Sequence, residues 1–326
     1  MTAWRRFSSV RGARASLAAL ALFALAGLGA DLIASDLPLA ARVDGHLYVL
    51  PCLTHPAALV DEDQQTLAAR AAWTWPTPIP YGPAASRPGG REDVLAGPSW
   101  RHLAGTDDRG RDVAARLVHG ARTALLVGGV AVTLFLSMGV AVGSAAAASP
   151  ALDLVLGRVI EVGLTFPALF FLLALQGVLR ARGASSLVEV ALAIALTRWP
   201  DVARLTRIES RRVAASPHVE AARGLGATPL AIAWRHVLPL AAGPALVAAA
   251  LGFGQAVLLE TGLTFLGLGV APPTASWGEL LAEAHASGLP AHLVVAPTLA
   301  IALLVAAASR VAEGLRVILD PASERR

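Results

Sequence analysis

The sequence predicts an all-α integral membrane protein with six transmembrane helices and an extended segment outside the membrane after the first helix. Hydrophobic residues make up 55% of the chain, whereas soluble domains contain about 45–50%. These residues are concentrated in runs of Leu, Ala, Val and Gly that are long enough to span a membrane. Arginines gather at the ends of the runs, where the topology of a membrane protein explains them.

The apolar runs define the predicted helices. The first run, at residues 15–34, follows a segment with four arginines and could be a signal peptide. Its length of about 20 residues favours an uncleaved first span. The other five predicted spans cover residues 123–148, 155–179, 187–205, 240–268 and 293–308.

The arginines also predict the orientation of the chain. If both termini are cytoplasmic, the short outside loops hold only Arg180 and Arg182, as the excess of positive charge on the inside requires. We therefore expect a cytoplasmic N-terminus and first helix at 1–34 and a periplasmic segment at 35–119. A five-helix core at 120–315 would follow, with a cytoplasmic loop at 206–239 and a cytoplasmic tail at 316–326.

The predicted periplasmic segment is polar and rich in Pro and Trp. Asp44-Gly45 lies between two short apolar stretches, which is typical of a tight hairpin turn. We expect a small sheet here. The single cysteine, Cys52, excludes an internal disulfide and a Cys-rich metal site.

The basic residues limit the chemistry of the chain. All 27 are arginine, and a phosphate-binding P-loop needs a lysine. This chain therefore cannot carry a P-loop, any ATP hydrolysis would take place on a partner protein, and we expect no cofactor on this chain. The net charge of +4 does not indicate nucleic-acid binding, because the arginines follow the ends of the apolar runs.

The most informative part of the sequence is the loop from Glu220 to Pro239. Ser216-Pro217 is a typical helix start, and Gly226 can take the left-handed conformation that ends a helix. Thr228-Pro229 starts a second helix, in which Leu230, Trp234 and Val237 would form an apolar stripe. Pro239 would mark the entry to the fifth span. Such a pair of short helices suits either a groove on another protein or a lipid surface.

The residues of this loop resemble the EAA motif of permease subunits of ABC importers. The matching residues are Glu220, Ala221, Ala222, Gly226, Leu238 and Pro239, whereas the generic motif has an apolar residue where this chain has His236. In that family the loop forms a coupling helix that docks on the ATP-binding cassette subunit, so the resemblance implies the same role for these residues. The version Arg235-His236-Val237-Leu238-Pro239 is similar to the peptide-importer branch.

Further motifs extend the resemblance over residues 100–320. They include the segment from Gly105 to Asp112, Phe166-Pro167, Trp199-Pro200, the segment from Leu263 to Gly269, and the segment from Pro272 to Gly278. The chain resembles the second permease subunit of dipeptide, oligopeptide or nickel importers. The resemblance implies a bacterial inner-membrane protein that contacts lipid. Its partners would be another permease subunit, ATPase subunits and a periplasmic substrate-binding protein.

Polar residues near the spans have two interpretations. Gln255, Glu260 and Glu161 could line a translocation pathway or serve helix packing. Asp107, Asp108 and Asp112 could bind a metal, but Arg109 and Arg111 nearby favour ion pairing. Asp201 can pair with Arg204 on one helix face. Glycines at 128, 129, 139 and 143 predict close packing of the second span on a neighbour.

Two other classes of function are weaker alternatives. A secondary transporter would carry a small solute without ATP, but it usually shows internal repeats, and none is evident. A membrane enzyme would need a nucleophile with a base or a metal set, and the histidines form no HExxH motif. The sequence therefore favours a non-enzymatic permease.

Overall fold

The computed structural model describes residues 3–59, 62–85, 94–181 and 186–319. The chain divides into two compact units. Unit 1 consists of residues 1–20, 127–259 and 304–326, and unit 2 of residues 21–126 and 260–303. Residues 320–326 of the predicted cytoplasmic tail, and Arg182 of the predicted outside loop, lie beyond the described residues.

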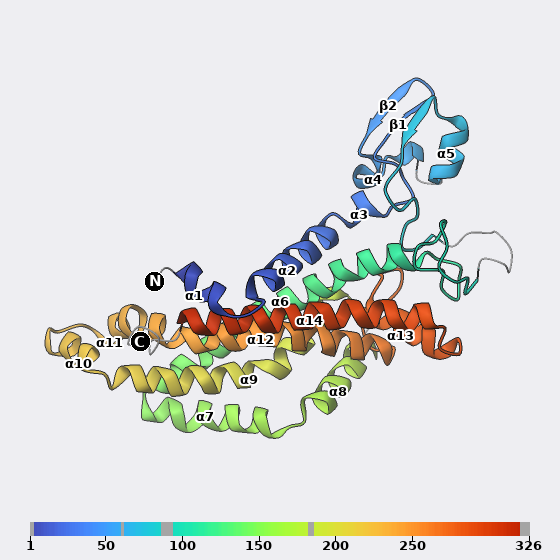
Figure 1. Cartoon of the computed structure of the whole chain (residues 1–326). Helices are drawn as coiled ribbons and strands as arrows, with labels where there is room; N and C mark the ends of the chain where they lie inside the picture. Colours follow the sequence, from blue (N-terminus) through green and yellow to red (C-terminus); the bar gives the residue numbers. More distant parts are fainter. Residues whose placement is uncertain (1–2, 60–61, 86–93, 182–185, 320–326) are drawn as a thin grey trace. The chain divides into compact units, whose positions relative to one another are not determined.

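Helices dominate the chain (Figure 1). Those up to the middle of the chain are α1 (Ala3–Ser9), α2 (Ala13–Leu28), α3 (Ala30–Ile33), α4 (Pro51–Thr54), α5 (Gln64–Arg70), α6 (Val113–Ala148), α7 (Pro150–Thr165) and α8 (Ala168–Ala181). The later ones are α9 (Leu187–Ala214), α10 (Pro217–Gly224), α11 (Pro229–Ile232), α12 (Leu238–Phe265), α13 (Trp277–Ala286) and α14 (Ala291–Leu319). The mostly helical fold confirms the predicted class.

The predicted count of six spans is only partly supported. Among the described residues, three helical stretches are long and apolar enough to cross a membrane: Val113–Ala148, Pro229–Phe265 and Ala291–Leu319. Two bent pairs, α1 with α2 and α7 with α8, meet the same test together, which raises the number to five. The 28-residue helix α9 does not meet it, because charged residues from Arg198 to Arg212 follow its apolar half.

The predicted third span is two helices instead of one. α7 and α8 meet at an angle of 92°. Phe166, between them, is extended, with φ −77° and ψ 128°. Pro167 causes this bend, because a proline disfavours helical backbone at the preceding residue and cannot donate a helix hydrogen bond.

Helix α6 packs closely on its neighbours in unit 1 through glycines, as the small-residue spacing predicted. A Cβ on Gly139 would lie 2.5 Å from the Cβ of Val202, and one on Gly143 would lie 2.4 Å from the carbonyl oxygen of Ala203. Both contacts are on α9. Gly129 is different, because no atom of another described element lies within 4 Å of its Cβ position.

Unit 2 contains the predicted small sheet. Strands β1 (Ala40–Val43) and β2 (His46–Val49) pair antiparallel, and β3 (Trp73–Trp75) pairs with the other edge of β1. The connecting residues Asp44 and Gly45 have φ of 50° and 83°, the two positive values that a type I′ hairpin requires. The predicted hairpin is confirmed.

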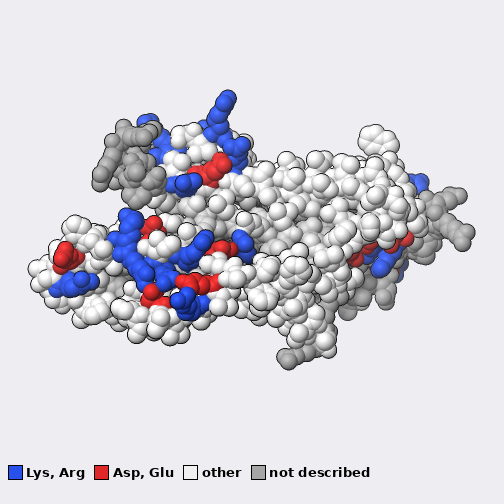
Figure 2. Space-filling model, turned by 90° about the horizontal axis from the view of Figure 1, so that it is seen from below, with Lys and Arg blue, Asp and Glu red and all other residues white. Residues whose placement is uncertain are grey.

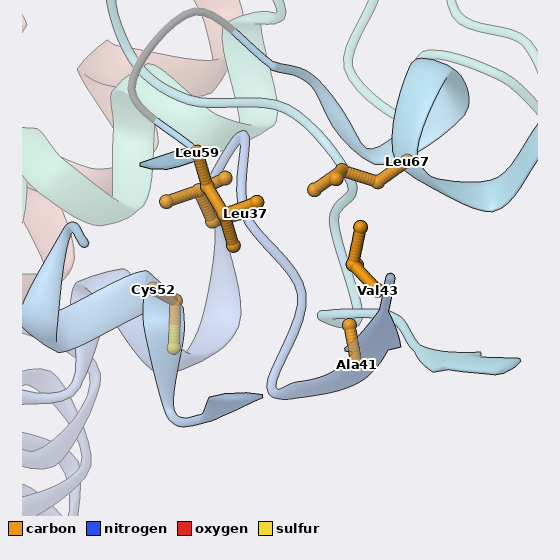
Figure 3. Packing of buried hydrophobic residues seen from close by; sticks show 6 residues of the cluster. All are labelled: Leu37, Ala41, Val43, Cys52, Leu59 and Leu67. Atoms are coloured by element: carbon orange, nitrogen blue, oxygen red, sulfur yellow. The ribbon is translucent and has the colours of Figure 1, made fainter. Parts of the chain in front are cut away.

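A small apolar core supports this sheet (Figure 3). Side chains from the segment before β1, from β1, α4 and α5, and from the 3₁₀ helix η1 (Ala57–Leu59) gather in it; they are Leu37, Ala41, Val43, Cys52, Leu59 and Leu67. Cys52 is fully buried and has no partner thiol, since it is the single cysteine of the chain. Burial raises the pKa of the Cys52 thiol.

A buried ion network links α6 to α13 within unit 2. Arg116 is fully buried and contacts Asp107, Glu279 at 2.7 Å and Glu283 at 2.5 Å. Arg111 also pairs with Asp107 at 2.7 Å and with Glu283 at 2.5 Å. Burial raises the pKa of Glu283, and its contacts with both arginines oppose that rise.

The network supports ion pairing at the acidic cluster after Gly105. Asp107, Asp108 and Glu283 bring carboxylate oxygens within 4.8 Å of one another, but Arg116 already neutralises two of these groups. Asp112 pairs with His102 at 2.8 Å. These contacts favour the ion-pairing interpretation over a metal site.

Candidate functional site

The candidate site is the segment that connects α9 to α12 in unit 1. Helix α10 starts at Pro217, after Ser216 in extended backbone, as predicted. The Ser216 hydroxyl does not cap the helix, however, and instead donates to the carbonyl of Val213 at the end of α9. Glu220 lies in the first turn of α10, where the helix dipole favours a carboxylate.

The end of α10 is a Schellman motif built around Gly226. The Ala227 N–H donates to the carbonyl of Ala222 at 3.1 Å, and the Gly226 N–H donates to the carbonyl of Arg223 at 3.0 Å. Gly226 has φ +84°, the left-handed conformation that this motif requires. The predicted role of Gly226 as the helix stop is confirmed.

The second predicted short helix is not separate from the fifth span. The Thr228 hydroxyl accepts the N–H of Ala231 and caps α11 as predicted. The chain then passes without a break through a π-helical turn, η3 (Ala233–Val237), into α12. Pro239 lacks the N–H that an α-helix needs and would clash with the carbonyl four residues earlier. The wider π turn, in which the Leu238 N–H donates to Ala233, accommodates it.

The inner face of the loop is buried. Val219 of α10 and Ile232 of α11 pack with Val237, Val213 of α9 and Ala241 of α12. This cluster fixes α10 against the helices on both sides of it. The predicted stripe is therefore only partly right, because Val237 points inward whereas Leu230 and Trp234 do not. Trp234 and Val237 both lie in the π turn η3, whose wider spacing turns Val237 away from the face that carries Leu230 and Trp234.

The outer face presents large apolar side chains. Leu225 is 89% exposed, Leu230 69% and Trp234 64%. Charged residues, Glu220, Arg223 and Arg235, are exposed around them. Figure 2 shows charged side chains gathered over the end of unit 1 that carries α10 and α11, next to the uncharged surface of the long helices. A rigid, exposed apolar patch with a charged rim is typical of a protein-binding surface.

The structure brings the predicted loop residues onto this one segment. Glu220, Ala221, Gly226, Arg235 and Pro239 are exposed on it. The remaining three, Ala222, His236 and Leu238, are half-buried. Sequence reasoning missed Leu225, although a lone leucine between two glycines in a polar turn is itself an indication of a contact residue.

The predicted pathway residues are in different environments. Glu260 is 1% exposed and accepts hydrogen bonds from Thr264 at 2.9 Å and Ser276 at 2.8 Å, which favours the packing interpretation. Glu161 is on the surface and pairs with Arg158 at 2.7 Å. Gln255 is exposed and accepts a hydrogen bond from Arg198. Asp201 pairs with Arg198 at 3.3 Å, and not with Arg204 as predicted.

Comparison with curated proteins finds peptide permeases. A protein of Brucella suis named as a peptide permease is 35% identical over 261 residues, which cover 78% of this chain and 83% of that protein. The di/tripeptide transport system permease protein DppC of Pseudomonas aeruginosa is 38% identical over 255 residues, covering 76% of this chain and 82% of DppC.

The fold and a family model agree with these relatives. A chain of the methionine ABC transporter MetNI, in an inward-facing conformation, superposes with a TM-score of 0.50 at 18% identity and covers 61% of this chain and 96% of that chain. Residues 139–325 match the model of the binding-protein-dependent transport system inner membrane component. This match favours an ABC importer permease over a secondary transporter. The chain belongs to the family of inner-membrane components of binding-protein-dependent transport systems, and is a multi-pass membrane protein of an ABC importer.

Proposed function

We propose that this chain is a permease subunit of an ATP-driven importer of peptides and that the α10–α11 loop docks on an ATPase subunit. The exposed apolar side chains of Leu225, Leu230 and Trp234 carry this proposal. Leu225 lies in a turn whose backbone is fixed by the Schellman motif. Leu230 and Trp234 lie on α11 and η3, whose inner face is packed against α9 and α12. A rigid patch loses little conformational entropy when it binds.

The mechanism follows from how the loop is connected. Because α11, η3 and α12 form one continuous helix, a push on the patch is transmitted directly to a membrane-spanning segment. ATP binding would close two ATPase subunits, move the loop with them, and rearrange the spans for alternating access. The loop supplies a mechanical link and no chemistry, and ATP and magnesium bind to the ATPase subunits.

The other partners follow from the same assignment. A second permease subunit would complete the pathway, and a periplasmic binding protein would deliver the substrate. Both termini and the docking loop would be cytoplasmic, with the sheet of unit 2 on the periplasmic side. Peptides are the proposed substrate because the relatives from B. suis and P. aeruginosa are named as peptide and di/tripeptide permeases.

The test is ATP-driven uptake by the assembled complex in proteoliposomes. We expect uptake of a labelled dipeptide, no uptake of free nickel ion, and loss of uptake with Glu220→Lys or Gly226→Pro while the protein stays in the membrane. Normal uptake and normal recovery of the ATPase subunit with both changes would refute docking through this loop. Uptake of nickel ion in place of dipeptide would refute the substrate class.

A further inference from the structure

A groove runs between α9 and α12 within unit 1. At the end near the docking loop it is a cavity of about 470 Å³, whose walls include Glu209 and Arg212 of α9 and Leu240 of α12. A second cavity of about 170 Å³ is lined by Arg198, Asp201 and Gln255. Ala248 and Leu251 line both cavities, so the two adjoin.

Most of the polar side chains that line the groove belong to α9, and Arg316 of α14 also lines the larger cavity. The residues of α9 that line it are Arg198, Asp201, Val202, Leu205, Glu209 and Arg212. Their spacing of three and four places them on a single helix face. Along α12 the lining extends from Leu240 to Gln255, roughly 22 Å at 1.5 Å per residue. The groove therefore follows much of the thickness of a membrane.

A charge pair lines the smaller of the two cavities. Arg198 contacts Asp201 at 3.3 Å, with side chains 24% and 41% exposed, and it also donates to the side-chain oxygen of Gln255. The Nε of Arg198 is buried and has no partner among the described residues. The opposite wall belongs to the candidate membrane span Pro229–Phe265. Charged side chains beside a membrane span cost free energy when they face lipid, and they normally face a water-filled path instead.

We infer that this groove is the chain's share of the translocation pathway, and that Arg198 and Asp201 form a site on it for the two charged ends of a peptide in transit. This inference rests on the proposed function and deepens it. A guanidinium pairs well with a terminal carboxylate, and the carboxylate of Asp201 suits a terminal ammonium. The Gln255 amide can bond a peptide group.

The pairing between Arg198 and Asp201 also sets the strength of the site. A peptide must compete with an existing ion pair, so binding is weak and reversible. Weak binding suits a pathway, since a transported solute must leave as easily as it enters. The charge pair selects zwitterionic solutes over those that carry only one charged end.

The first test measures maximal uptake rates with the binding protein at a saturating concentration. Under this condition the affinity of the binding protein for each substrate does not affect the comparison. The substrates are a dipeptide and the same dipeptide with an amidated C-terminus. We expect the wild-type complex to transport the free acid at least ten-fold faster. Arg198→Gln should bring the ratio of the two rates close to one. The matched control is Arg204→Ala, an exposed arginine of α9 that lines neither cavity.

The second test measures water access in a Cys52→Ala background. Gln255→Cys should react with a membrane-impermeant thiol reagent at least ten-fold faster than Leu246→Cys, and dipeptide should slow it. Leu246 is 45% exposed on α12 but does not line the groove. Equal rates at the two positions, or cross-linking of Gln255→Cys to the second permease in all states, would overturn the inference.

The two proposals fail in different ways. If the wild-type complex takes up no peptide, the proposed function fails. If it takes up peptide and Arg198→Gln keeps the wild-type ratio of rates, only the inference about the groove fails.

Discussion

Trp234→Ala is the substitution that should weaken ATPase docking most while leaving the fold intact. Trp234 is 64% exposed. A tryptophan can bury up to about 250 Å², so docking could remove roughly 160 Å² of it from water. At about 25 cal/mol per Å² this is worth at most about 4 kcal/mol. Side-chain ordering lowers the gain, so we expect a loss of about 2–3 kcal/mol, or about 30- to 150-fold in Kd.

The assay is titration of the purified ATPase subunit onto the permease in nanodiscs, with thermal unfolding measured on the same samples. Trp75→Ala is the matched control, because Trp75 is 66% exposed but lies on β3 in unit 2. Both variants should unfold within about 1 kcal/mol of wild type, as exposed positions usually do. A Kd for Trp234→Ala within three-fold of the Trp75→Ala value would refute the reasoning.

Three further predictions concern the backbone and the buried charges. Gly226→Ala should strain the left-handed turn by about 1–2 kcal/mol and reduce uptake, whereas Gly224→Ala, at a helical position with open space around it, should not; equal uptake by both would contradict this. Gly143→Val should destabilise the packing of α6 on α9 by at least about 1–3 kcal/mol, seen as lower yield of folded protein, while Gly129→Val should be tolerated. Arg116→Met should cost about 3–5 kcal/mol by leaving buried carboxylates unpaired, and a thermal midpoint unchanged from wild type would show that the network adds no stability.

Local chemistry made several features predictable. Asp44-Gly45 and Gly226 were identified correctly because a positive φ is easiest for Gly, Asn and Asp. The long apolar runs predicted helices, since burial in lipid requires them. The docking segment itself was found from its helix caps and glycine turn.

Other features have no local pattern to reveal them. The pairs of Arg116 with Glu279 and Glu283 join residues far apart in sequence, and only the fold brings them together. The prediction of a separate second short helix was wrong, because the π turn η3 joins α11 to α12 just before Pro239, and Val237 of that turn packs in the buried cluster. Because of the same π turn, Leu230 and Trp234 lie on the outer face of the loop whereas Val237 lies on its inner face.

The partners of Arg198 show the limit of sequence spacing most clearly. Asp201 is three residues from both Arg198 and Arg204, so the spacing alone allows either pair. The structure pairs it with Arg198, next to Gln255 of α12. The sequence analysis named Gln255 as a possible pathway residue, but the contact between Gln255 and Arg198 joins two helices and therefore has no local pattern in the sequence.

Photo-cross-linking from position 225 in native membranes tests the docking claim most directly. Leu225 is 89% exposed at the tip of the loop, so a benzophenone amino acid there should not disturb the fold. We predict a cross-link to an ATP-binding subunit, which a label at Leu53, 46% exposed in unit 2, does not form. Cross-linking of position 225 to lipid alone would contradict the claim.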